Sequence, residues 1–265
     1  MKITVFTSNQ RRHVSLIEGL AAVADAVFAV QEVTTLFPGI VDDFYRKTPV
    51  MQRYFQYVMA AEEKLFAPPR FLPGNVRTVS MKMGDLNRLS CDWLAEGLEA
   101  DLFVILGASF IKPPLVDLLL ARDAINIHMG TSPYYRGNSC NFWALYDQNA
   151  EYVGATIHRL GRGLDSGPIL FHTLPEYAGE SSFEYTMKAV KSAQLGLISK
   201  IADGSVTKIN ALMQDKSKQI RYSKNEHFTD EICAEFLSRE PSPQILAQQS
   251  ARRKMDLFTS PFILR

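Results

Sequence analysis

Two separated segments of the chain carry side chains that suit acyl transfer. Asn126 and His128 stand two residues apart in a short apolar stretch, and residues i and i+2 of an extended strand point to the same face. Asp165 follows further along, in a loop punctuated by glycines. An amide stabilises an oxyanion, and an imidazole and a carboxylate move protons. The pattern therefore predicts that Asn126, His128 and Asp165 converge on one site for acyl transfer.

The elements that must position these side chains follow an alternating order. The patterns predict a strand over residues 2–6, a helix over 14–24 and a strand over 26–30, and the segment 101–106, apolar throughout after Asp101, suits a strand buried on both faces. This order predicts an α/β fold with a doubly wound, mainly parallel sheet. Ligands of such sheets bind beyond the carboxyl ends of the strands. Three segments fall there: 7–12, 107–112 and 126–137.

The rest of the chain divides near Gly204. Before it, periodicity predicts helices over 50–65, 91–98, 113–120, 140–146 and 182–201, and strands over 124–128 and 154–159. After it, residues 206–213 and 219–222 are expected to pair as a hairpin, before a helix over 229–237 and a basic, apolar tail. We therefore predict a catalytic domain over 1–204 and a small C-terminal extension (hairpin, helix and tail) over 205–265.

Composition excludes several classes of function. The 265 residues are 46% hydrophobic and 22% charged, with a formal net charge of +1, so no electrostatic footprint points to nucleic acid. The longest apolar stretch, 102–111, is too short to span a membrane, and the N-terminus does not resemble a signal peptide. Cys91, Cys140 and Cys233 form no C-x-x-C pair, which argues against a disulfide framework or a zinc site. We expect a cytoplasmic protein without a metal.

Two segments resemble the folate-dependent formyltransferases. Residues 126–137 (NIHMGTSPYYRG) resemble that family's active-site pattern N-x-H-x-S-x-L-P-x-Y-R-G. Residues 154–169 resemble its second segment, G-x-T-x-H followed by D-x-G-x-I. The resemblance covers roughly residues 76–205 and departs at 129–132, where Gly130 replaces a hydroxyl residue that could contact the amine substrate.

The resemblance implies formyl transfer from N10-formyltetrahydrofolate to an amine. His128 would stabilise the oxyanion or shuttle a proton, Asn126 would donate to the oxyanion, and Asp165 would accept a proton from the attacking ammonium or hold a relay water. His158 either stands behind the site as a second donor or is simply a buried histidine with its hydrogen bonds satisfied.

Three groups of residues are expected to bind the ligands, and the resemblance implies the first of them. The pterin ring of the folate would lie against Ser109, Phe110, Ile111, Leu160, Gly161, Arg162 and Gly163, although residues 107–112 also suit a plain strand-to-helix turn. Asn9 and Arg11 lie where a helix N-terminus and arginines would bind a phosphate, or they belong to a capped turn with solvated arginines. Tyr134, Arg136 and Asn138 would line the acceptor pocket, unless Arg136 and Gly137 only shape the turn.

The acceptor is inferred from length and from local resemblance. About sixty residues follow Gly204, fewer than the RNA-binding barrel of a tRNA-directed enzyme needs and more than a glycinamide ribonucleotide enzyme carries. Residues 140–145, 214–217, 221–226 and 228–230 resemble sugar-nucleotide N-formyltransferases, whose products feed O-antigen and other surface polysaccharides. The overall pattern resembles the enzymes that act on GDP-4-amino-4,6-dideoxymannose (GDP-perosamine). An aromatic residue in 40–75 would stack on the base.

Other functions stay open at this point. They are a methionyl-tRNA or glycinamide ribonucleotide formyltransferase, a formyltetrahydrofolate hydrolase, and a binding protein without catalysis. The expected partners are folate and a nucleotide-linked amino-sugar, with no nucleic acid and no membrane. A homodimer is expected, with the predicted hairpin or the apolar tail as its surface.

Overall fold

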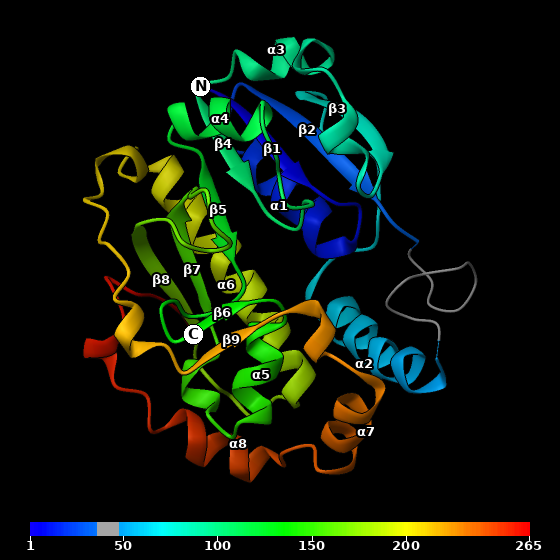
Figure 1. Ribbon diagram of the computed structural model, residues 1–265, viewed down its shortest axis with the longest axis vertical. Helices are drawn as coiled ribbons and strands as arrows, with labels where there is room; N and C mark the ends of the chain where they lie inside the picture. Colours follow the sequence, from blue (N-terminus) through cyan, green and yellow to red (C-terminus); the bar gives the residue numbers. More distant parts are fainter. Residues whose placement is uncertain (36–47) are drawn as a thin grey trace.

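The computed structural model of the protein describes residues 1–35 and 48–265 (Figure 1). The centre of this part is an eight-stranded sheet in the order β10-β8-β7-β5-β4-β1-β2-β3. The strands are β1 (Lys2–Thr7), β2 (Ala26–Val33), β3 (Val76–Lys82), β4 (Leu102–Ile105), β5 (Ile125–His128), β7 (Ala155–Arg159), β8 (Ile169–Pro175) and β10 (Phe262–Leu264). Neighbours are parallel except at β7, which is antiparallel to β5 and β8. The predicted α/β fold with a mainly parallel sheet is confirmed.

Helices cover both faces of the sheet. They are α1 (Arg11–Ala21), α2 (Pro49–Leu65), α3 (Ala95–Leu98), α4 (Leu115–Ala121), α5 (Cys140–Tyr146), α6 (Ser182–Ala202), α7 (Asp230–Ser238) and α8 (Pro243–Ser250). On one face α1 and α6 pack against Ile3 and Val5 of β1, and on the other face α4 packs against Phe6 and Phe103. Alternate side chains of a strand therefore enter two separate apolar layers, as the period of two requires. The predicted helix over 91–98 is instead a 3-10 turn (Cys91–Leu94) followed by α3.

A third apolar cluster lies beyond the sheet and is rich in aromatic side chains. Tyr54 of α2 meets the rings of Phe142, Phe183, Phe228 and Phe236 edge-on, with centroids 5.2 to 6.5 Å apart. Such edge-to-face pairs stabilise a core beyond the area that they bury. Tyr54 is thus a packing residue. Of the segment 40–75 that we expected to stack on a base, residues 40–47 lie outside the described part.

The chain after Gly204 runs around the outside of the body, in orange and red in Figure 1. The predicted hairpin is wrong. The strand β9 (Arg221–Ser223) instead pairs in parallel with β6 (Tyr135–Gly137), directly after the turn that follows β5. Two main-chain donors, Ile220 N and Arg221 N, both reach the carbonyl of Tyr134, at 2.8 and 3.0 Å. Residues 220–223 therefore pair with the distant strand β6 and the residue before it, and not with the neighbouring segment 206–213.

The tail joins the central sheet. Its residues Phe262–Leu264 form β10, which pairs in parallel with β8 at the sheet edge. The boundary near Gly204 stays a prediction. Among the described residues no helix is long and apolar enough to cross a membrane, and no three His, Cys, Asp or Glu side chains gather as metal ligands would.

Candidate active site

The three predicted catalytic side chains meet where β5 and β7 lie side by side. The Asp165 carboxylate oxygen Oδ1 is 3.2 Å from Nδ1 of His128 and 3.9 Å from Nε2 of His158. The amide nitrogen of Asn126 is 3.0 Å from the same His158 Nε2. His158 faces Asn126 because these two residues are register partners across the β5–β7 pair. The structure thus brings together an amide, a carboxylate and two imidazoles.

The surroundings of His128 favour its charged form. Its Nε2 is 3.1 Å from the carbonyl oxygen of Tyr135, while Nδ1 faces the Asp165 carboxylate. Both partners only accept hydrogen bonds, so both ring nitrogens donate. Burial by itself lowers the pKa of His128, but the Asp165 carboxylate, helped by Cys140, outweighs it and raises this pKa well above the usual value. His128 is therefore an imidazolium at neutral pH.

His158 has the opposite character. Its Nδ1 lies 2.6 Å from the carbonyl of Arg159 and donates to it, which leaves Nε2 to accept from Asn126. Burial lowers the pKa of His158 to about 4, against the opposing effect of Asp165. Neutral His158 is thus buried with both nitrogens satisfied. It also orients the amide of Asn126, since Nε2 can take only an N–H and so turns the amide nitrogen toward itself.

Asp165 is held in an unusual backbone conformation. Its φ is +47°, in the left-handed region that residues other than glycine rarely adopt. Burial would raise the pKa of its carboxyl, but the charge of His128 and a hydrogen bond from the Gly137 backbone N–H lower it. Two residues later, a side chain at Gly167 would overlap the carbonyl oxygen of Arg159, so only glycine lets the loop approach β7. The carboxylate therefore stays ionised beside His128.

Gly130 leaves space next to the imidazole. A Cβ atom at this position would stand 2.7 Å from Nε2 of His128 and would overlap Cβ of Cys140. The hydroxyl residue of the family pattern would therefore require a shift here. Cys140 begins α5, and its Sγ donates to the carbonyl of Gly137 at 3.3 Å. Cys140 was not predicted as a site residue, since nothing in the spacing of a lone cysteine indicates that it lies against His128.

The first predicted folate segment is held by a buried carboxylate. Glu32 accepts from the backbone N–H of Ser109 at 2.6 Å, from its hydroxyl at 3.0 Å, and from Gly84 N at 2.7 Å. The N–H of Ser109 is thus already used within the protein. Phe110 is 55% exposed at this edge, whereas Ile111 is buried. Sequence reasoning missed Glu32, although an acidic residue at the end of an apolar strand was a visible signal.

The second predicted folate segment lies on the same face of the sheet. Leu160 packs into the apolar layer that contains Ile111 and α4. Beyond it, Arg162 pairs with Asp117 of α4 at 2.7 Å, and the N–H of Gly163 donates to the hydroxyl of Ser166. Gly161 is the remaining member of this loop and lies against Gly167 and Ser166. The two segments thus both lie next to α4, and a folate pocket that they share stays a prediction.

The residues at the first turn are engaged with other parts of the protein. The Asn9 side chain bonds the backbone N–H and carbonyl of Thr34, both at 2.9 Å. Arg11 pairs with Glu63 at 2.8 Å. A buried carboxylate, Glu62, accepts the backbone N–H of Arg12 at the start of α1, where an anion would bind. These contacts favour the capped turn over a phosphate site, although Arg11 is paired with a carboxylate and is not simply solvated.

The residues after β5 serve the turn and the loop of Asp165. The Tyr134 hydroxyl donates to the carbonyl of Leu257 at 2.9 Å. Arg136, 8% exposed, donates through Nη2 to the carbonyl of Leu164 at 3.0 Å. The main chain of Asn138 bonds Ser223 of β9. These contacts favour a shaping role for Arg136.

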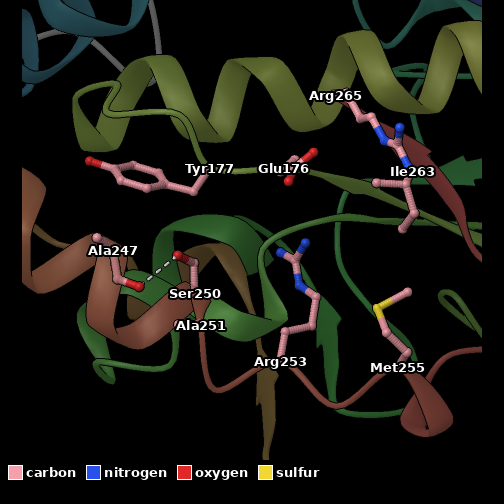
Figure 2. A pocket seen from close by; sticks show the side chains of 9 residues that line it. All are labelled: Glu176, Tyr177, Ala247, Ser250, Ala251, Arg253, Met255, Ile263 and Arg265. Carbon is pink, nitrogen blue, oxygen red and sulfur yellow. Dashed lines mark hydrogen bonds between the residues drawn. The ribbon is translucent and has the colours of Figure 1, made fainter.

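A cavity of about 450 Å³ lies elsewhere on the described part of the molecule (Figure 2). It is lined by Glu176, Tyr177, Ala247, Ser250, Ala251, Arg253, Met255, Ile263 and Arg265. Arg253 points into it, yet its guanidinium already donates to the carbonyls of Glu151, Val153 and Pro175. None of the residues of the cluster around His128 lines this cavity, and none of its lining residues was a predicted site residue.

Comparison with known proteins identifies the segment that carries this cluster. Residues 90–201 match the family described as formyl transferase. The methionyl-tRNA formyltransferase of Synechococcus sp. (strain JA-3-3Ab) is 27% identical over 124 residues, which are 46% of this chain and 38% of that protein. Across five such relatives the matched stretches cover 22% to 51% of the relative's length.

Two solved structures share the fold over most of the chain. A sugar N-formyltransferase from Shewanella sp FDAARGOS_354 has a TM-score of 0.53 at 19% identity, covering 86% of this chain and 78% of that one. An N-formyltransferase from Helicobacter canadensis, in complex with folinic acid and dTDP-3-aminofucose, has a TM-score of 0.50 at 13% identity, with 86% and 72% covered. At such identities the likeness shows the fold alone.

Proposed function

We propose that this chain, whose residues 90–201 match the formyl transferase family, transfers a formyl group from N10-formyltetrahydrofolate to the amine of a nucleotide-linked amino-deoxy sugar. One observation carries the proposal. Within the matched segment, a cationic His128, an ionised Asp165 and an oriented Asn126 meet at the carboxyl end of β5. Two neighbouring imidazoles with pKa values pushed apart are typical of acid–base sites.

Each side chain would have a distinct part in the reaction. Asp165 would take the proton that the amine must lose as its nitrogen bonds to the formyl carbon. Asn126 would donate its second amide hydrogen to the oxyanion, because the first goes to His158. His128 would stabilise the same oxyanion by its charge. It would then give a proton to the folate nitrogen as the bond between that nitrogen and the formyl carbon breaks.

The sugar-nucleotide acceptor rests on sequence resemblance and on fold. Residues 140–145 and 214–230 resemble the sugar-nucleotide enzymes, and two enzymes of that kind share the fold. The Helicobacter canadensis protein was determined with a folate and a nucleotide amino-sugar together, which supports the same pair of ligands here. GDP-4-amino-4,6-dideoxymannose, a role in surface polysaccharides and a cytoplasmic setting remain part of the proposal.

The homodimer also remains a proposal, although the structure changes both surfaces that we expected to form it. The predicted hairpin does not form, and the tail is engaged as β10 within the sheet of its own chain. Gel filtration with light scattering that shows a monomer at working concentration would remove the dimer from the account.

A turnover assay with a panel of amines tests the proposed function. The panel contains GDP- and dTDP-linked 3-amino and 4-amino sugars, glycinamide ribonucleotide and methionyl-tRNA, with tetrahydrofolate release followed and products identified by mass. We expect formylation of one nucleotide sugar. Formylation of another amine alone would overturn the acceptor, and release without any formylated amine would identify a hydrolase.

A further inference from the structure

We propose that Gln214 is a positioning residue that holds Asp165 against His128, so that the segment 205–223 completes the active site from outside the matched family segment. This inference rests on the proposed function for its catalytic meaning. Its geometric content, that Gln214 fixes the carboxylate beside the imidazole, can be tested without turnover.

The carboxamide of Gln214 grips the loop of Asp165 at two points. Its Nε2 is 2.8 Å from the carbonyl oxygen of Asp165 and 2.8 Å from that of Gly167. Both hydrogens of the amide are therefore used on this loop. The two carbonyls belong to the residues on either side of Ser166, so these hydrogen bonds hold the backbone that carries the carboxylate.

The loop needs such a grip. Residues 160–168 form turns and bends without helix or strand, so no ladder of main-chain hydrogen bonds holds them. Asp165 also sits at a φ of +47°, which a residue with a side chain leaves readily unless its surroundings hold it. Arg136 supplies a neighbouring contact, donating to the carbonyl of Leu164 at 3.0 Å. Side chains from outside the loop thus bind three of its carbonyls.

The segment around Gln214 is itself held in place by main-chain hydrogen bonds. Two residues before it, Leu212 exchanges both main-chain hydrogen bonds with Ile169 at the start of β8, at 2.7 and 2.8 Å. Six residues after it, Ile220 bonds the carbonyl of Tyr134. The segment is therefore tied at both ends, to the strand after the Asp165 loop and to the turn after His128.

The predicted consequence reaches His128 through Asp165. The groups that face His128 are Asp165 from the loop, Cys140 from α5, His158 from β7 and His172 from β8. Among them Asp165 alone is a carboxylate, at 3.2 Å. A loop that drifts after loss of the grip would leave the imidazole buried without its counter-charge, so its proton affinity would fall.

The test compares Gln214→Leu with a matched control, Gln244→Leu, which makes the same change on an exposed position of α8. Leucine has a similar volume and donates nothing. The pKa of His128 is measured by NMR titration of the imidazole in each protein, with the signal assigned from a His128→Gln variant. Gln214→Met replaces the leucine variant should thermal unfolding show that the leucine protein does not fold.

We expect the pKa of His128 to fall by about one unit in Gln214→Leu, a tenfold loss of proton affinity, and to stay unchanged in Gln244→Leu. With the acceptor found by the panel, kcat should fall about tenfold while both KM values change little, and the alkaline limb of the pH–rate profile should move to lower pH. An unchanged pKa would overturn the proposal even if activity fell. Because the titration needs no substrate, a failure of the proposed function would be seen separately.

Discussion

At the residue scale, two imidazoles 6.4 Å apart between ring centroids differ in protonation state. His128 has acceptors on both ring nitrogens, one of them the Asp165 carboxylate, and is charged. His158 has one acceptor and one donor and is neutral. Residue type is the same, so the neighbours decide the chemistry. Spacing in the sequence predicted which residues meet, but the protonation states depend on hydrogen-bond partners that only the fold supplies.

Replacing Asp165 with asparagine tests the charge of His128. The amide keeps the shape but removes the charge that raises the pKa of His128, and burial then leaves this pKa below the usual value of about 6.5. Since we propose that the imidazolium is the active form, turnover at pH 7.5 should fall about a hundredfold or more. The alkaline limb of the pH–rate profile should move to lower pH. A profile identical to that of the unchanged protein would contradict the assignment.

At the element scale, long periodic patterns predicted helices and strands correctly, whereas very short strands were not predicted. The continuous apolar run of β4 and the capped helix α6 follow from local sequence. The three-residue strands β9 and β10 do not, because their partners, β6 and β8, lie far away in the chain. The hydrogen bond from Gln214 to the carbonyl of Asp165 was not predicted for the same reason, as the two residues are 49 positions apart.

Replacing Glu32 with glutamine tests how the loop after β4 is held. The carboxylate accepts from Gly84 N, Ser109 N and the Ser109 hydroxyl, and an amide would turn an NH₂ group toward at least one donor. We expect a loss of stability of about 1–3 kcal/mol. Folate affinity should also weaken if Ser109 lies at the pterin pocket.

Urea unfolding and a folate-binding titration measure these two effects. Glu99→Gln, which makes the same change at an exposed position, serves as the control and should alter neither quantity. Equal stability and equal folate affinity in Glu32→Gln would show that the carboxylate does not organise this loop.

At the scale of the whole molecule, buried neutral histidines make the fold sensitive to acid. Burial lowers the pKa values of both His158 and His172 to about 4, against about 6.5 in an unfolded chain. Between these pH values the unfolded chain binds more protons, so stability falls as the pH falls. Each group accounts for about 3 kcal/mol between pH 6.5 and 4. The raised pKa of His128 adds no slope in this window, because its stabilisation is complete below pH 6.5.

Urea unfolding between pH 7 and pH 4.5 checks this expectation. The free energy of unfolding should decrease steadily through this range, before most carboxylates titrate. A constant free energy from pH 6.5 to 4.5 would show that these histidines are not buried in the neutral form.

The aromatic cluster around Tyr54 joins distant parts of the chain. Phe228 and Phe236, which follow the segment 205–223, pack on Tyr54 and Phe142, so the chain beyond that segment is held against α2 and α5. Three of these residues, Tyr54, Phe142 and Phe236, lie in helices that the sequence predicts separately, and Phe228 lies just before the last of them. The sequence did not show that they form one cluster, since the distance along the chain between α2 and α7 hides their contact.

The measurement that tests the central claim most directly is formyl transfer by His128→Ala beside the unchanged protein. Tetrahydrofolate release and formylated product are followed with the acceptor found by the panel, and binding of folinic acid is measured by calorimetry in both proteins. We predict that turnover in His128→Ala falls to background while folinic acid affinity changes less than about threefold, because the histidine acts on the oxyanion and not on the pterin. Full activity in His128→Ala would contradict the assignment of the site.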